Sequence, residues 1–146
     1  MASSLKVLGS VFLLLLPLWE QLIYGQNLSR EEFMKQHHLR PSQAFSQYKC
    51  DVLMKEIQGL KEKNSHIFLY TPWHQIYNVC FRTWRERKRN VYVWSKQPFK
   101  TLKCSKRNSE DMYREKRSYS YVEFHCSVEG YVDSIEDLQV LGVIYY

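Results

Sequence analysis

Four cysteines in a short chain constrain this sequence more than any other feature. Cys50, Cys80, Cys104 and Cys126 stand in a chain of 146 residues, which is long enough for one compact domain and too short for a TIM barrel, a protein kinase or a two-domain nucleotide-binding enzyme. In an oxidising compartment an even number of cysteines predicts two disulfides, with three connectivities open. No CxxC or HxxxH pair brings two metal ligands together, so we expect no zinc site and no cofactor.

The first 25 residues have the pattern of a secretory signal peptide. Lys6 gives a positive start, Val7–Trp19 form an apolar run, and Gly25 is a small residue where a peptidase can cut. A transmembrane anchor is the alternative, but it needs about 20 uninterrupted apolar residues, and Glu20 ends the run early. We expect a signal peptide over residues 1–25, one secreted domain over residues 26–146, and no transmembrane segment.

The chain is basic, with 21 Lys and Arg against 15 Asp and Glu and a formal net charge of +6. The leader contains Lys6 and Glu20, so its removal leaves the net charge unchanged. At 45% hydrophobic and 15% aromatic residues, the composition excludes a disordered basic tail. A basic secreted domain is typical of proteins with anionic partners, such as nucleic acid, a sulfated glycan or a membrane surface.

Helical patterns occupy the first half of the secreted part. The first helix, from Ser29 to Pro41, begins with an S-x-x-E capping box. The second runs from Cys50 to about Leu60 and has its apolar residues on one face. For the third, Thr71 is the expected N-cap and Pro72 the first helical residue.

Strand patterns dominate the second half. A turn at residues 128–130 joins the last two expected strands into a hairpin, and Val122, Phe124 and Cys126 point to one face. The expected strands are His66–Tyr70, Asn90–Trp94, Leu102–Cys104, Ser118–Cys126 and Tyr131–Ile135. The sequence therefore predicts an α+β domain with three short helices packed on an antiparallel sheet.

Several strings resemble the pancreatic ribonuclease family. They are Q-H at residues 36–37, Y-K-C-D-V-L-M at 48–54, and L-K-E-K-N-S at 60–65, which resembles C-K-x-x-N-T with Leu60 in place of the cysteine. Longer strings resemble the epididymal secretory protein E-three family (beta-like), a non-catalytic ribonuclease-like branch linked to sperm maturation. These strings are F-M-K-Q-H at 33–37, Y-V-E-F-H-C at 121–126 and G-Y-V-D-S-I-E-D-L at 130–138.

The resemblance implies a ribonuclease-type fold with a long twisted antiparallel sheet. It also implies the disulfides Cys50–Cys104 and Cys80–Cys126, and the absence of the family's other two bridges. The loss of the bridge at Leu60 should loosen the segment that carries Lys61.

Ribonuclease chemistry needs a base, an acid and a cation near the phosphate. By resemblance, His37 matches the family's first histidine and Lys61 its lysine. The family's V-H-F-D stretch corresponds to D-S-I-E-D at residues 133–137, which is acidic and lacks a histidine. We therefore expect a vestigial site without efficient RNA hydrolysis, with residual activity left open. The remaining histidines are expected to be surface or packing residues: His38, His66, His74 and His125.

Two further features point to surface roles. A basic loop around Trp84 is a candidate anion-binding site, because basic and aromatic side chains together suit nucleic acid, heparan-like glycans or anionic membranes. The alternative is a solvated edge. The candidate residues are Arg82, Arg85, Arg87, Lys88 and Arg89. Asn27 begins an N-x-S sequon and is a candidate glycosylation site, with an unused sequon as the alternative.

Together, the strings and the incomplete catalytic set predict a secreted epididymal protein that is catalytically inactive. By resemblance it acts in sperm maturation by binding the sperm surface or anionic ligands such as sulfated glycans, with nucleic acid bound weakly at most. The alternative is a weak secreted ribonuclease or a cationic host-defence protein. The sequence specifies neither a receptor nor an oligomeric state.

Overall fold

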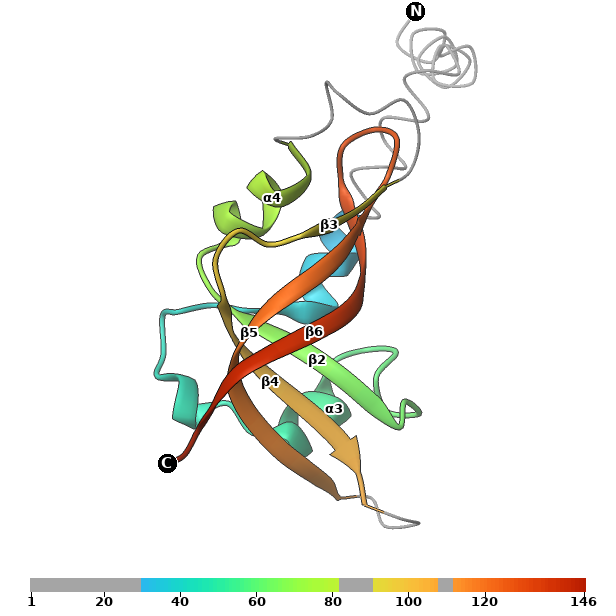
Figure 1. Ribbon diagram of the computed structural model, residues 1–146. Coiled ribbons are helices and arrows are strands. Elements are labelled where there is room, and N and C mark those ends of the chain that lie inside the picture. Colours follow the sequence, from blue (N-terminus) through green and yellow to red (C-terminus); the bar gives the residue numbers. More distant parts are fainter. Residues whose placement is uncertain (1–29, 82–90, 108–111) are drawn as a thin grey trace, which may run out of the picture.

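A twisted antiparallel sheet with helices packed against it forms the domain (Figure 1). The computed structural model describes residues 30–81, 91–107 and 112–146. Residues 30–37 are helical and are followed by the elements β1 (His38–Leu39), η1 (Phe45–Gln47), α3 (Cys50–Glu56), β2 (Ser65–Tyr70), α4 (Trp73–Phe81), β3 (Val91–Trp94), β4 (Phe99–Lys106), β5 (Tyr113–Cys126) and β6 (Val132–Ile144). This architecture confirms the predicted α+β class.

Strand β5 is the centre of the sheet, because it pairs with three other strands. The order is β1-β2-β4-β5-β3, and β6 also pairs with β5. The first part of β5 pairs with β4, and residues 123–126 pair with β3. All pairings are antiparallel except the two-residue parallel contact of β1 with β2.

The β5–β6 hairpin closes through the predicted turn. Gly130 has a φ of 93°, a left-handed conformation that glycine adopts without steric cost, and its N–H donates to the Ser127 carbonyl at 3.0 Å. The Ser127 N–H in turn donates to the Tyr131 carbonyl at 2.9 Å. The strand predicted after this turn, Tyr131–Ile135, is too short. In the structure β6 pairs with β5 as far as Ile144, which lies opposite Arg117.

Two apolar clusters form the core, and each contains one disulfide. The first cluster includes the disulfide Cys80–Cys126, whose two cysteines are 46 residues apart in sequence. The second includes Cys50–Cys104, whose cysteines are 54 residues apart. These are the pairs that the ribonuclease resemblance implied. Closing loops of this length stabilises a folded domain by about 4 kcal/mol per bridge. The predicted inward face of β5 is confirmed, because Val122, Phe124 and Cys126 are all fully buried.

Three helix limits differ from the prediction. The first helix gives way at His38 to β1, because residues 38–39 pair with β2. Helix α3 ends at Glu56, ahead of Gly59, whose φ of 90° is not helical. Helix α4 begins at Trp73, and the Thr71 hydroxyl donates to the Gln75 side-chain oxygen at 2.5 Å instead of capping the backbone.

Candidate functional site

His37 lies at the end of the first helix and is held by a carbonyl group of β2. Its Nδ1 donates a hydrogen bond to the Ile67 carbonyl oxygen at 2.8 Å. Because a carbonyl oxygen only accepts, the proton of the neutral ring is on Nδ1, and Nε2 is left as an acceptor. The sequence identified this histidine by its match to the ribonuclease family, and its position at the junction of helix and sheet comes from the structure.

A second histidine belongs to the same site. The ring of His66 stacks on that of His37 with a centroid distance of 4.3 Å. Phe33 lies against His37 at 4.6 Å and Phe68 against His66 at 4.8 Å, so four rings follow one another. His66 was predicted to be either a surface or a packing residue, and its burial shows that it is a packing residue. Its placement on the same face of β2 as Phe68 was the available sign that it points inward.

This environment lowers the pKa of both histidines. Burial, followed by the neighbouring His66 and by Lys63, lowers the pKa of His37 from 6.5 to about 3, against an opposing effect of the Ile67 hydrogen bond. Burial and then Lys63 lower the pKa of His66 from 6.5 to about 4, against the hydrogen bond to Gln36. Both rings are therefore neutral at neutral pH.

Lys61, the other residue of the predicted vestigial site, is exposed and follows a buried leucine. Leu60 has no exposed area and packs in the second core cluster. The Tyr113 hydroxyl lies 3.4 Å from the carbonyl oxygens of both Lys61 and Lys63. Apolar packing and the tyrosine thus attach this segment to the sheet, and the loosening expected from the missing bridge stays a prediction.

By resemblance, the family's second histidine falls within residues 133–137, and we take Ile135, in the middle of this stretch, as its position. This residue lies opposite Phe124 in the β5–β6 ladder and is half-buried against the first core cluster, which also contains Phe33. An isoleucine has no group that donates or accepts a proton. Packing therefore occupies the place at which the family's acid–base partner is expected.

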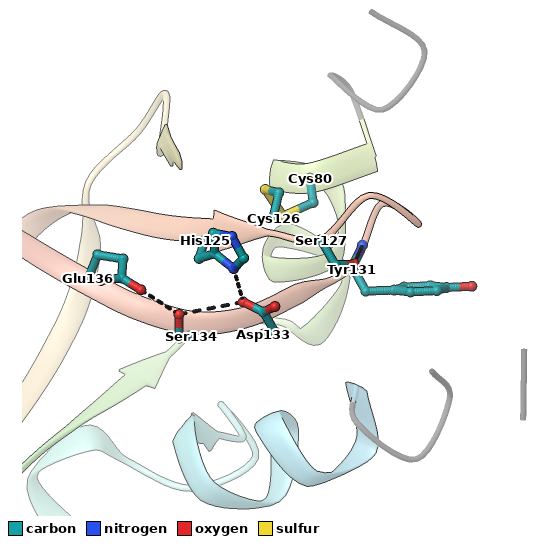
Figure 2. Close-up of polar contacts among 8 residues, drawn as sticks. All are labelled: Cys80, His125, Cys126, Ser127, Tyr131, Asp133, Ser134 and Glu136. Atoms are coloured by element: carbon teal, nitrogen blue, oxygen red, sulfur yellow. Dashed lines mark hydrogen bonds and ion pairs between the residues drawn. A yellow bond between two sulfur atoms is a disulfide. The ribbon is translucent and has the colours of Figure 1, made fainter. Parts of the chain in front are cut away.

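His125 lies on the hairpin, within a different set of contacts. Figure 2 shows its ring pointing toward Asp133, with Nδ1 to Oδ1 at 2.5 Å. The Ser134 hydroxyl lies near both Asp133 and Glu136, at 3.5 and 2.6 Å. The other ring contact of His125 is with Tyr92 on β3, whereas His37 contacts Phe33 and residues of β2. His125 is therefore not placed as a substitute partner for His37.

The candidate basic loop at residues 82–89 lies outside the described residues, as do Asn27 and the predicted signal peptide. The described part of the chain carries another basic surface on β4 and β5. Lys103 lies directly opposite Lys116, and both are exposed. The next pair on that face is Ser105 with the exposed Arg114. Like charges directly opposite one another in a sheet are destabilising, so this strip of Lys103, Arg114 and Lys116 keeps a repulsion that an anion can relieve.

Arg117 is basic in sequence but is not part of that surface. It is 9% exposed, forms an ion pair with Glu115 at 3.2 Å, and donates to the Tyr48 carbonyl. Its guanidinium also lies over the Phe45 ring at 5.6 Å. These contacts make it a structural residue that joins β5 to the segment before α3.

Two cavities flank α4, and neither is lined by His37 or Lys61. One of about 370 Å³ lies between α4 and the region of β3, with Ser95 and Phe99 in its wall. The other, of about 570 Å³, is bounded by Arg40, Trp73 and Tyr77. Among the described residues, no helix has the length and hydropathy needed to cross a membrane.

Comparisons with known proteins agree with this picture. The sequence profile described as pancreatic ribonuclease matches residues 28–137. Epididymal secretory protein E3-beta of Homo sapiens is 51% identical over 145 residues, which cover 99% of this chain and 99% of that protein. Epididymal secretory protein E3-alpha of Homo sapiens is 45% identical with the same coverage.

Solved structures show the same fold at low identity. Amphinase, a cytotoxic ribonuclease from Rana pipiens oocytes, superposes with a TM-score of 0.62 at 17% identity, covering 77% of this chain and 98% of that one. Green turtle egg white ribonuclease gives 0.60 at 16% identity, covering 76% and 98%.

Proposed function

The chain belongs to the pancreatic ribonuclease family, and from this premise we propose that it is a secreted, catalytically inactive binding protein that acts on maturing sperm. Two relatives that match nearly the whole chain are named epididymal secretory proteins, which supports secretion into epididymal fluid and the signal peptide over residues 1–25. The ligands are anionic groups such as sulfated glycans of the sperm surface. Nucleic acid binds weakly at most.

The ring stack at His37 supports catalytic inactivity. A base with a pKa of about 3 holds a proton too weakly to accept one efficiently from a ribose hydroxyl. Ile135 provides no acid for the leaving group, and the carboxylates of Asp133, Glu136 and Asp137 around it repel a phosphodiester. Loss of one acid–base partner typically lowers a rate by about 10²–10⁴-fold, and this chain has lost one and weakened the other.

The facing pair Lys103 and Lys116 is the observation that carries the binding function. A folded sheet that keeps two exposed lysines opposite each other gives up stability, and a bound polyanion compensates for it by neutralising both charges. Arg114 extends the strip along β5. Sulfate groups spaced along a glycan chain suit such a strip, because each accepts hydrogen bonds from a cationic side chain.

Heparin chromatography with a charge-matched control tests this proposal. The double variant Lys103→Gln with Lys116→Gln neutralises the strip. It should elute from heparin at a clearly lower salt concentration than wild type. The control Lys55→Gln with Lys96→Gln removes the same charge from exposed positions elsewhere and should elute close to wild type. On sperm membranes, too, the strip variant should be retained less than the control variant. Equal elution of the two double variants would show that only net charge matters and would contradict the proposed strip.

The basic loop gives the second arm of this experiment. Neutralising Arg85, Arg87, Lys88 and Arg89 should lower retention further, because polyanion binding grows with the number of charges in contact. If retention on heparin and on sperm membranes does not change, the loop is a solvated surface.

The alternative function is a weak ribonuclease or a cationic host-defence protein. The observation in its favour is that this chain, a member of a ribonuclease family, contains both His37 and an exposed Lys61, which match two of the family's site residues by resemblance. RNA degradation that disappears in His37→Ala distinguishes this alternative from a binding protein.

A further inference from the structure

The larger of the two cavities beside α4 is a groove between that helix and the first helix. Met34 and His38 line it from the first helix and the residue that follows it, and Trp73 and Tyr77 line it from α4. Trp73 and Tyr77 are four residues apart on α4 and therefore lie on one face of it. The groove has a volume of about 570 Å³, within the range of roughly 300–1,000 Å³ that is usual for small-ligand sites.

Trp73 offers a flat apolar surface in this groove. The residue is 56% exposed, although its ring is held against the Tyr77 ring with a centroid distance of 4.9 Å. Tyr77 is held in turn, because the Arg30 guanidinium lies over its ring at 4.6 Å. An aromatic ring that is fixed in place and open on one side binds a partner at a small cost in conformational entropy.

The charge of the groove is positive. Arg40 lines it and is exposed, and within the described part of the chain its guanidinium forms no ion pair. The backbone at this position is fixed, because the Arg40 carbonyl accepts a hydrogen bond from the Tyr48 hydroxyl at 2.6 Å. None of the residues that line the groove is acidic. A guanidinium in such a place favours a ligand with a sulfate, phosphate or carboxylate group.

A hydrogen bond between the two sides keeps the groove in shape. The His38 ring donates from Nε2 to the Thr71 carbonyl oxygen at 2.6 Å, and Pro72, the next residue, lines the groove. The end of the first helix is therefore attached to the start of α4. A site whose walls are already in position loses little free energy to ordering when a ligand binds.

The openness of the groove favours a sugar ring over a lipid. Arg40, Pro41 and His74 are all exposed, so a ligand in the groove keeps one side in water. A lipid chain or a steroid needs a pocket that encloses most of its surface. A pyranose ring instead has a face of C–H groups, which packs on an aromatic ring, and a rim of hydroxyl groups that stay hydrated.

We propose that this groove binds one sulfated sugar ring, with the ring packed on Trp73 and the sulfate group paired with Arg40. The inference rests on the proposed function, in which sulfated glycans are the ligands. It adds a site that recognises the sugar ring itself, whereas the strip of Lys103, Arg114 and Lys116 responds to charge. Glycans of equal charge are then distinguished by the sugar that carries the sulfate.

Nuclear magnetic resonance titration tests the proposal on the full secreted chain with both disulfides formed. The probes are galactose 6-sulfate, galactose and inorganic sulfate, and the signals are the Met34 methyl group and the Trp73 indole N–H. The indole signal is identified by its loss in Trp73→Leu. Galactose 6-sulfate should shift both signals to saturation. Galactose and inorganic sulfate should shift them far less at the same concentration, because each makes only one of the two contacts.

Matched variants separate the groove from the rest of the surface. Trp73→Leu and Arg40→Gln should each weaken binding of galactose 6-sulfate by about tenfold or more, read at the Met34 methyl group. Trp94→Leu makes the same change at another exposed tryptophan, 41% against 56% exposed. Arg107→Gln does so at another exposed arginine. Both controls should bind like wild type, and the spectra show directly that each variant is folded.

Four outcomes would overturn the proposal. They are the absence of a saturable shift, equal weakening in the variants and their controls, inorganic sulfate that binds as tightly as the sulfated sugar, and uridine monophosphate that binds more tightly than it. The third would indicate an anion site without ring recognition, and the fourth a nucleotide site. Failure of the basic strip is seen separately, as equal elution of its two double variants from heparin, and leaves the Met34 shift unchanged.

Discussion

His37 and His66 each donate to a carbonyl group beside the other histidine. His37 binds the carbonyl of Ile67, the residue after His66, and His66 binds the carbonyl of Gln36, the residue before His37. With the rings stacked at 4.3 Å, the two histidines join the first helix to β2. A histidine matched to a catalytic position thus has a structural role.

This pairing predicts that stability falls in mild acid. The pKa of His37 is lowered from 6.5 to about 3 and that of His66 to about 4, so the unfolded chain binds protons at a higher pH than the folded one. The contribution of each histidine is fully present above about pH 6.5 and is lost as the pH falls toward its folded pKa. We expect a loss on the order of a few kcal/mol between about pH 6.5 and pH 4, measured by denaturant unfolding.

Isosteric variants separate this effect from the titration of carboxylates. In His37→Asn and His66→Gln the amide nitrogen replaces the donating ring nitrogen without a proton to gain, so the double variant should show a much smaller loss in the same pH window. His74→Gln, at an exposed position on α4, should behave like wild type. A double variant with the pH dependence of wild type would refute the role assigned to the histidine pair.

RNA hydrolysis should be absent, and restoring one histidine should not create it. We expect wild type, His37→Ala and Ile135→His to degrade RNA at the same background rate, because His37 stays stacked and weakly basic when a histidine is placed at position 135. The measurement is degradation of tRNA or poly(U), with a pancreatic ribonuclease as the positive control. Turnover by wild type that disappears in His37→Ala would favour the alternative function.

Leu60 should be a major anchor of the segment that carries Lys61. Leu60→Ala removes a fully buried side chain, and we expect it to cost about 2–5 kcal/mol of unfolding free energy. Amides of residues 61–64 should exchange faster in this variant. The control Val52→Ala, at a site that is 49% exposed, should change stability by less than about 0.5 kcal/mol. Equal effects of the two variants would mean that Leu60 does not replace the missing bridge.

Two neighbouring basic residues should respond in opposite ways to truncation. Arg117→Ala breaks an ion pair between the buried Arg117 and the partly exposed Glu115 and removes the hydrogen bond to the Tyr48 carbonyl, so we expect a loss on the order of 1–3 kcal/mol. Lys116→Ala removes the repulsion with Lys103 and should leave stability unchanged or slightly higher, within about 0.5 kcal/mol. Thermal and denaturant unfolding measure both changes. A Lys116→Ala variant as unstable as Arg117→Ala would exclude like-charge repulsion at that pair.

The sequence predicted those features that depend on near neighbours in the chain. The turn at Gly130 and the inward face of Val122 and Phe124 follow from local chemistry and a period of two, and both are confirmed. The limits of the helices were less well predicted, because the pairing of His38 with β2 ends the first helix. The site residue His37 was found through the family resemblance. Its neutral, stacked state could not be predicted, because it depends on contacts with residues of β2.

The residue pattern thus predicted the α+β class and, through the resemblance, a ribonuclease-like arrangement of helices and strands. Only the tertiary structure decided what several of its side chains do. It paired His37 with His66, turned Arg117 inward, set Lys103 opposite Lys116, and left β6 as an edge. The physical reason is that each of these outcomes depends on the register between segments distant in sequence, and burial and charge spacing follow from that register.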